Sequence, residues 1–140
     1  MDEKSAREAF ETAFATQKPV FGEFFLARLL GLDISYPGEN CVIEFEVKDF
    51  MFNPQGVLHG GVTAFVLDVS MGHLVNHSAG APGATLEMKT QYLRAVSPGL
   101  LRCEARFLKK GRRIGFLESH MSDSSGNLLA SATATFNMPG

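Results

Sequence analysis

The segment from residue 61 to residue 78 constrains the fold of this chain more than any other. It reads GVTAFVLDVSMGHLVNHS, and its spacing of apolar residues predicts a helix of about 18 residues. Apolar side chains occur on one flank (Val62, Phe65, Val66 and Val69) and on another (Ala64, Leu67, Met71 and Leu74). A helix that is apolar on all sides is usually a buried one, so the rest of the chain has to surround it.

The residues on either side of this helix predict strands. Residues 40–47 alternate apolar and polar side chains, which is the period of a half-buried strand. Spacing and turn signals predict four further strands, at 84–95, 99–108, 113–123 and 127–138. Strands that follow one another usually pair, so these four are expected to form a meander of sequence neighbours. The predicted fold class is α+β, with an antiparallel sheet of five to six strands curled around one long central helix.

The N-terminal part of the chain predicts a separate helix. Residues 1–17 are polar with apolar side chains at helical spacing, and Lys18-Pro19 ends that pattern. The short apolar stretch 24–30 is compatible with a helical turn or with the approach to a strand. A chain of 140 residues without repeats or linkers fits a single domain, 1–140, whose core spans about 40–137.

Charge and cysteine content argue against several classes of function. Thirteen Lys and Arg against fifteen Asp and Glu give a net charge of −2, which disfavours nucleic acid and a polybasic membrane surface as partners. Asp68 interrupts the only long uncharged region, and charges stand where a signal peptide needs apolar residues. Cys41 and Cys103 form no metal-ligand pattern and have apolar neighbours, so both are expected to be reduced and buried. These features predict a cytoplasmic protein without a metal.

Two glycines and one aspartate on the central helix are the candidate reactive groups. Gly60 and Gly61 stand at the start of the helix, where free N–H groups and the helix dipole can polarise a carbonyl oxygen. The same glycines would also allow a tight entry from the loop into the helix. Asp68 is costly to bury in an apolar helix without a partner, so it either acts on a substrate or makes a structural bond to the backbone or to Ser70.

The spacing between these groups predicts an oligomer. Asp68 lies eight residues beyond Gly60, so their α-carbons are about 12 Å apart along the helix axis. If both groups act on one carbonyl, they must therefore come from two chains. This predicts a homodimer with two equivalent sites at its interface.

The motif around these residues resembles that of a known family. Asn53, the run GVLHGG at 56–61, and Asp68 nine residues after the histidine of that run resemble the hotdog-fold thioesterases of the PaaI-like group. That group belongs to the 4-hydroxybenzoyl-CoA thioesterase superfamily, and the likeness is closest to its thioesterase superfamily member 2-like branch. It covers about residues 40–137 and implies a hotdog fold, an acyl-CoA thioesterase activity without a cofactor, and dimers that pair into a homotetramer.

The resemblance also implies roles for individual residues. The Gly60 amide would polarise the thioester carbonyl, and Asp68 of the partner subunit would act as general base on a water or as nucleophile. Asn53 would position the water or the leaving group. His59 would orient the loop and the site, and Thr85 would help to hold the water.

Further residues are candidates for substrate binding. Gly61 lies in the motif, and Phe52, just ahead of it, is a candidate wall of an acyl pocket. Lys110, Arg112 and Arg113 belong to a predicted hairpin, and they either form a solvated turn or meet the phosphates of CoA.

Two histidines on the central helix invite a different interpretation. His73 and His77 have the i, i+4 spacing of a zinc helix, but Leu74 stands where that motif needs Glu, and no third ligand is evident. The favoured explanation is that the helix dipole stabilises histidines near the helix C-terminus.

Two rival functions remain open at this stage. A hotdog enoyl-thioester hydratase or dehydratase would share the fold. Enzymes of that kind, however, use a histidine with a carboxylate as acid and base. A non-catalytic acyl-CoA-binding or regulatory protein would not need Asp68 in an apolar helix. The sequence leaves aromatic, medium-chain and long-chain acyl groups open.

Overall fold

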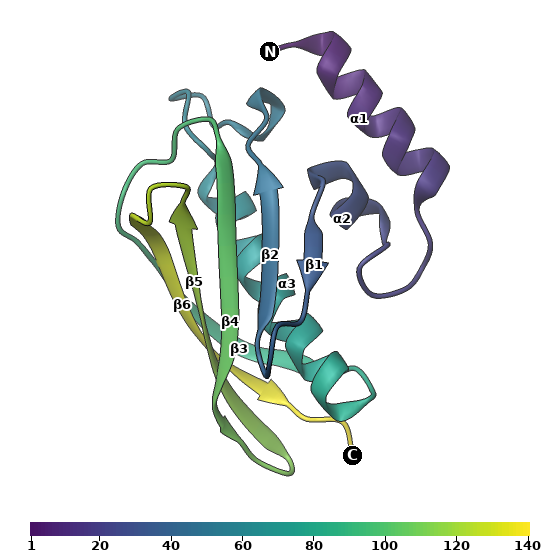
Figure 1. Ribbon diagram of the computed structural model, residues 1–140, viewed down its shortest axis with the longest axis vertical. Helices are drawn as coiled ribbons and strands as arrows, with labels where there is room; N and C mark the ends of the chain where they lie inside the picture. Colours follow the sequence, from purple (N-terminus) through teal and green to yellow (C-terminus); the bar gives the residue numbers. More distant parts are fainter.

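The computed structural model describes residues 1–140, which fold into three α-helices, a 3-10 turn and six strands (Figure 1). The helices are α1 (Glu3–Thr16), α2 (Phe25–Leu30) and α3 (Gly60–Ala79), and the 3-10 turn is Asp49–Met51. The strands are β1 (Asp33–Ser35), β2 (Cys41–Glu46), β3 (Ala84–Tyr92), β4 (Leu100–Lys110), β5 (Ile114–Asp123) and β6 (Leu128–Asn137).

The six strands form one antiparallel sheet that wraps around α3. Their order is β1-β2-β4-β5-β6-β3, and every neighbouring pair is antiparallel. Figure 1 shows α3 behind the sheet, with α1 and α2 beyond the β1 edge. The predicted fold class, a hotdog-type sheet curled around one long helix, is confirmed. The stretch that the sequence left ambiguous at 24–30 is helical.

The pairing predicted for the strand after α3 is wrong. Instead of joining its sequence neighbour β4, β3 pairs with β6, from Ala84 opposite Asn137 to Tyr92 opposite Ala130. The place beside β4 is taken by β2. The cause is α3 itself: the sheet has to cover a helix inserted between β2 and β3, so these two strands lie on opposite sides of it. The segment 93–99 then leads from β3 to β4, which pairs with β2.

The core lies between α3 and the concave face of the sheet. Its largest fully buried side chains come from both layers, including Phe45, Leu67, Met71, Leu117 and Phe136. Cys41 and Cys103 are buried and free, as predicted. Burial raises the pKa of the Cys41 thiol to about 12. No helix of the chain combines the length and apolar character that crossing a membrane requires.

Two surfaces of this fold remain uncovered. On α3, a row of residues spaced by four is only half-buried, and we call it the open row: Gly60, Ala64, Asp68, Gly72 and Asn76. Strand β3 ends the sheet, so its outer edge is unpaired, and most of its residues are exposed. The fold thereby leaves Asp68 at the centre of an accessible helix face.

Candidate active site

The start of α3 offers one unused backbone donor. His59 is the N-cap of the helix, and its Nδ1 accepts a hydrogen bond from the Gly61 N–H at 2.9 Å. The Gly60 N–H has no acceptor in the protein. Helix N-termini carry a partial positive charge, so the unpaired Gly60 N–H is a donor available to an oxygen atom of a ligand. The Nδ1 atom of His59 is occupied in shaping this turn.

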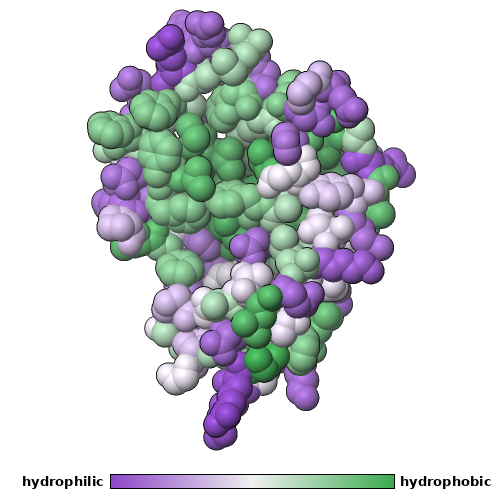
Figure 2. Space-filling model, turned by 180° about the vertical axis from the view of Figure 1, so that it is seen from behind, coloured by the Kyte–Doolittle hydropathy of each residue, from purple (hydrophilic) through white to green (hydrophobic).

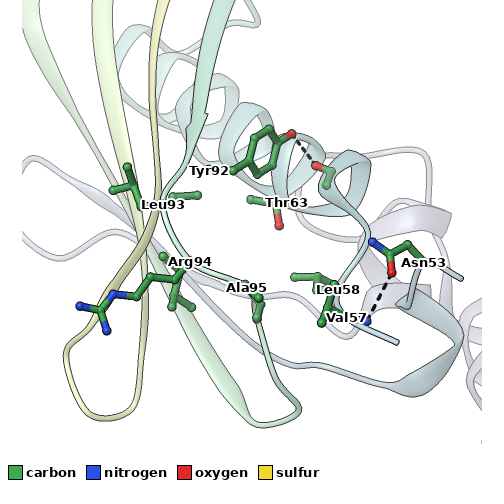
Figure 3. A pocket seen from close by; sticks show the side chains of 12 residues that line it. Asn53, Val57, Leu58, Thr63, Tyr92, Leu93, Arg94 and Ala95 are labelled. Atoms are coloured by element: carbon green, nitrogen blue, oxygen red, sulfur yellow. Dashed lines mark hydrogen bonds between the residues drawn. The ribbon is translucent and has the colours of Figure 1, made fainter. Parts of the chain in front are cut away.

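A cavity of about 330 Å³, which we call the helix-start cavity, opens beside this amide (Figure 3). Gly60 and Asn53 line it together with Thr63, Tyr92 and Arg94. The Tyr92 hydroxyl donates to the Gly60 carbonyl at 2.7 Å, so this ring lies directly against the helix start. Neither Tyr92 nor Arg94 was predicted from the sequence as a site residue. Their place at the end of a strand and the start of a loop was the available signal.

Asn53 organises the loop that precedes the helix. Its side-chain oxygen accepts hydrogen bonds from the backbone N–H groups of Gln55 at 2.9 Å and Val57 at 3.4 Å. Figure 3 shows this side chain at the rim of the helix-start cavity. Its Nδ2 donates to no protein group, and it is available to a ligand.

Asp68 lies half-buried in the middle of α3. Its Oδ1 accepts a hydrogen bond from the Thr85 hydroxyl at 2.8 Å. Ser70 instead donates to the Leu67 carbonyl and contacts the Ser119 hydroxyl, so the interpretation of Asp68 as a structural partner of Ser70 is wrong. With one hydroxyl as its partner, the carboxylate keeps acceptor sites free for a water or a substrate.

A β-bulge brings Thr85 to this carboxylate. The register of β3 against β6 shifts between Thr85 and Glu87, so that Leu86 is an extra residue. Thr85 lies opposite the buried Phe136, whereas Glu87 lies opposite Thr135 on the outer face of the sheet. In a regular strand, residues two apart point to the same face. The bulge therefore turns Thr85 inward while Glu87 points outward.

A second cavity, of about 380 Å³, lies beside Asp68, between α3 and the segment Lys18–Phe24. We call it the N-terminal cavity. Its other lining residues are Pro19, Val20, Phe21, Phe24, Val69, Gly72 and His73. It shares no residue with the helix-start cavity. Within one chain, the free amide of Gly60 and the carboxylate of Asp68 therefore belong to separate cavities, about 12 Å apart along the helix.

The other predicted substrate contacts lie away from both cavities. Phe52 is half-buried, packs against the core and lines neither of them. Lys110 ends β4, and its Nζ donates to the Ser78 carbonyl near the C-terminus of α3. Arg112 and Arg113 are exposed in the predicted hairpin turn. These cations thus gather at the opposite end of α3 from Gly60.

Comparison with known proteins places this chain in a family. The family model of the thioesterase superfamily matches residues 55–130, which include Gly60, Asp68 and Thr85. The chain belongs to the thioesterase superfamily. It is therefore an enzyme that hydrolyses thioesters.

Individual relatives agree with this thioesterase assignment. The chain is 30% identical to mouse acyl-coenzyme A thioesterase 13 over 105 residues, which are 73% of this chain and 75% of that protein. A phenylacetic acid degradation-related protein from Ralstonia eutropha superposes with a TM-score of 0.76 at 29% identity, covering 93% and 99% of the two chains. A Bacillus halodurans protein crystallised with CoA shares the fold, with a TM-score of 0.82 at 21% identity over 99% of this chain and 91% of that one.

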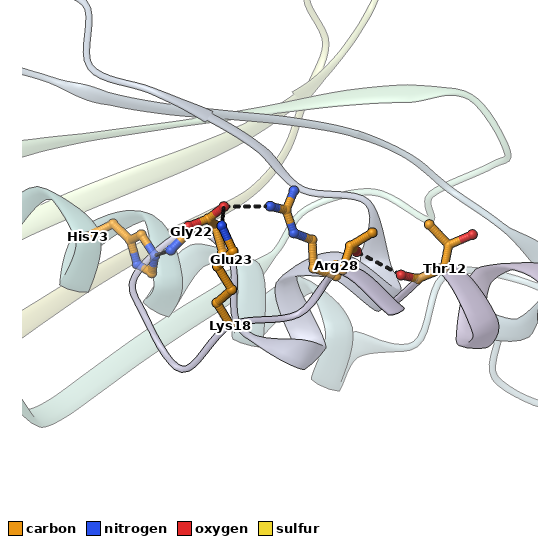
Figure 4. A network of polar contacts seen from close by, with 7 residues as sticks. Thr12, Lys18, Gly22, Glu23, Arg28 and His73 are labelled. Atoms are coloured by element: carbon orange, nitrogen blue, oxygen red, sulfur yellow. Dashed lines mark hydrogen bonds and ion pairs between the residues drawn. The ribbon is translucent and has the colours of Figure 1, made fainter. Parts of the chain in front are cut away.

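The two histidines of α3 have structural contacts in this thioesterase. His73 is buried, and its Nε2 accepts a hydrogen bond from the Gly22 N–H at 2.8 Å (Figure 4). His77 stacks on Tyr36, with ring centroids 3.9 Å apart. The explanation by the helix dipole is wrong for His73, because it is a buried acceptor six residues before the helix ends at Ala79. It ties the N-terminal segment to the helix.

The His73 contact predicts a pH dependence of stability. Burial lowers the pKa of His73 below its ordinary value of 6.5. The unfolded chain then binds a proton that the folded chain resists, so His73 contributes its full stability above pH 6.5 and loses it as pH falls through the folded-state pKa. Glu104 and Asp123 also have a lowered pKa, but their contribution to stability changes only below pH 4.5. We expect the melting temperature to fall between pH 7 and pH 5, and this slope to flatten in a His73→Phe variant.

Proposed function

We propose that this thioesterase hydrolyses acyl-CoA to the free acid and CoA, at sites shared between two subunits of a homodimer. The observation that carries the proposal is the separation of the free Gly60 amide from the Asp68 carboxylate into two cavities of one chain. The acyl-CoA substrate class is supported by the relatives named acyl-coenzyme A thioesterase 13.

The uncovered surfaces support a symmetric dimer. Within the open row of α3, Ala64 lies midway between Gly60 and Asp68, and the small residues of the row allow a second helix to approach closely. If two copies cross antiparallel at Ala64, each Gly60 comes beside Asp68 of the partner subunit, because both lie four residues from the crossing. The unpaired edge of β3 can meet the same edge of the second copy, which would bury exposed strand groups. Such an isologous contact creates two sites.

The chemistry follows from the two groups. The Gly60 amide would hydrogen-bond the thioester oxygen and stabilise the negative charge that develops there. Asp68 of the partner subunit would either take a proton from the water that attacks the carbonyl carbon, or attack that carbon itself to form a mixed anhydride that water then hydrolyses. In both routes the C–S bond breaks, CoA leaves as a thiolate and takes up a proton, and oxygen from water ends in the acid.

Other polar groups would assist without touching the reacting carbon. Thr85 holds the Asp68 carboxylate through its hydroxyl, and the free Nδ2 of Asn53 would bind the water or the leaving group. Lys110, Arg112 and Arg113 would meet the phosphates of CoA, since Lys110 contacts Ser78, which lies ten residues beyond Asp68 and about 15 Å along the helix axis.

A screen of acyl-CoA thioesters tests the proposed function. Purified protein is incubated with aromatic, medium-chain and long-chain acyl-CoA esters, and free thiol is followed with a disulfide dye. We expect thiol release that depends on enzyme concentration. Tight binding without thiol release would contradict hydrolysis and favour a binding protein, whereas hydration of an enoyl-CoA without thiol release would favour a hydratase.

The hydroxyl of Thr85 should matter for turnover more than for folding. Thr85→Val removes the donor to Asp68, and loss of a hydrogen bond to a charged group is expected to lower kcat roughly tenfold. Thr85→Ser keeps a hydroxyl and should retain most of the activity. Because Thr85 is exposed in the chain, both variants should melt near the wild-type temperature. Equal kcat for the Val and Ser variants would remove Thr85 from the mechanism.

A further inference from the structure

We infer that the acyl group of the substrate binds in the N-terminal cavity and that Phe21 limits the size of acyl group accepted. This inference rests on the proposed function and assigns its acyl-binding residues, which lie outside the sequence motif of residues 53–68. The residues in question are Pro19, Val20, Phe21 and Phe24, all from the segment between α1 and α2.

Reach and polarity point to this cavity. Asp68 lines it, so a carbonyl carbon within reach of that carboxylate has one of its two substituents, the acyl group or the CoA sulfur, at or inside the cavity. The remaining walls are largely apolar, with Val20 and Phe21 from the segment and Val69 from α3. The helix-start cavity is the less suitable of the two, because Arg94 belongs to its lining and the free amide of Asn53 lies at its rim (Figure 3). An apolar acyl group gains more by leaving water for the N-terminal cavity.

The wall that the segment forms is fixed rather than loose. Gly22 donates to His73 on α3, and Glu23 pairs with Arg28 at 2.9 Å and with Lys18 at 3.8 Å (Figure 4). A wall held in this way loses little conformational entropy when a ligand binds. His73 is thus a positioning residue, which acts on the acyl group through the segment it holds.

Phe21 and Val20 are the residues of this wall that still have apolar surface to bury. The Phe21 ring lies 4.8 Å from the His73 ring, yet the residue is 44% exposed, and its neighbour Val20 is 48% exposed. Figure 2 views the molecule from behind and shows apolar side chains gathered over the upper part of that face. Contact with an acyl group would remove this surface from water.

The dimensions indicate a compact apolar acyl group. The cavity volume of about 380 Å³ lies near the lower end of the range of about 300–1,000 Å³ that is usual for small-molecule sites. Two phenylalanine rings, of Phe21 and Phe24, flank the His73 ring, so an aromatic ring can pack against them edge-to-face or offset. A short aliphatic chain also fits, whereas a long chain would run against Phe21.

Two substitutions with opposite effects test the assignment. Phe21→Ala enlarges the cavity and Val20→Trp fills it, while Phe14→Ala removes an exposed ring of α1 that lines neither cavity. For each variant, kcat/KM is measured from butanoyl-CoA to hexadecanoyl-CoA and with phenylacetyl-CoA, and folding is checked by thermal denaturation. We expect Phe21→Ala to raise the ratio of kcat/KM for hexadecanoyl-CoA to that for butanoyl-CoA roughly tenfold. Val20→Trp should lower this ratio, and Phe14→Ala should leave it unchanged.

The outcomes separate this inference from the proposed function. Hydrolysis by folded Phe21→Ala and Val20→Trp variants with the wild-type acyl profile would overturn the acyl-site assignment and leave the thioesterase function intact. Absence of hydrolysis by the wild-type protein with every acyl-CoA would overturn the proposed function itself.

Discussion

Replacing Asp68 by Asn should reduce turnover by about 10²–10⁴-fold, the range that a positioned general base contributes. Asn is nearly isosteric, and its side-chain oxygen can still accept the hydrogen bond from Thr85. The substitution therefore removes the basic and nucleophilic oxygen with little change in shape. The measurement is kcat for the best acyl-CoA substrate, together with the melting temperature, which should not fall.

Glu87→Gln is the matched control for this variant. Glu87 also accepts a hydrogen bond from a threonine hydroxyl, that of Thr135 at 2.7 Å, but it lies on the outer face of the sheet. Loss of this carboxylate should leave kcat unchanged. A near-wild-type kcat in Asp68→Asn, or an equal loss of kcat in both variants, would contradict the role assigned to Asp68.

Replacing Gly60 by Pro should lower kcat by about 10²–10³-fold, the usual cost of losing one oxyanion donor. Proline removes the amide hydrogen and preserves the helical backbone at this position, because Gly60 is the first residue of α3, where proline is well tolerated. His59 has φ −61° and ψ 129°, a conformation that suits a residue before proline. No hydrogen bond of the folded chain is lost, since the Gly60 N–H has no acceptor in the protein.

Gly60→Ala separates the lost hydrogen from the added carbon atoms. A Cβ at this position would lie 3.2 Å from the Tyr92 ring, in both variants, so Tyr92 has to move by a few tenths of an ångström. The alanine variant keeps the N–H and should lose far less activity than the proline variant. If both variants lose the same activity, crowding against Tyr92 explains the defect and the amide has no special role.

The central helix and the strands were predictable because each has a period of its own. The apolar positions of α3 fixed both its length and its burial, and the turn signals fixed four of the strands to within a few residues. Two features were out of reach. The three residues of β1 are too few to show a period, and the pairing of β3 with β6 depends on which side of α3 each strand covers.

The residues of the site motif could be predicted from the sequence, but the contacts that hold them in place could not. Gly60, Asp68 and Asn53 stand in one short stretch, where their residue types already suggest chemistry. The contact of Thr85 with Asp68 depends on a bulge at Leu86, and sequence periodicity does not report such an inserted residue. Tyr92 reaches Gly60 only because β3 runs along the helix.

The N-terminal cavity was missed for a similar reason. The sequence placed His73 near the C-terminus of the central helix and predicted no role for the stretch 19–24. Their contact, from the Gly22 N–H to the His73 imidazole, joins residues 51 positions apart. No local sequence pattern predicts a contact between residues so far apart in the chain.

The shared site is tested most directly by subunit complementation. Gly60→Pro and Asp68→Asn chains, each inactive alone, are co-expressed in equal amounts, purified together and assayed for acyl-CoA hydrolysis. In a mixed dimer, one site combines an intact Gly60 with an intact Asp68 and the other has neither. Because half of randomly formed dimers are mixed, about a quarter of the wild-type activity should return. Activity that stays at the level of the separate variants would show that each chain carries its own complete site.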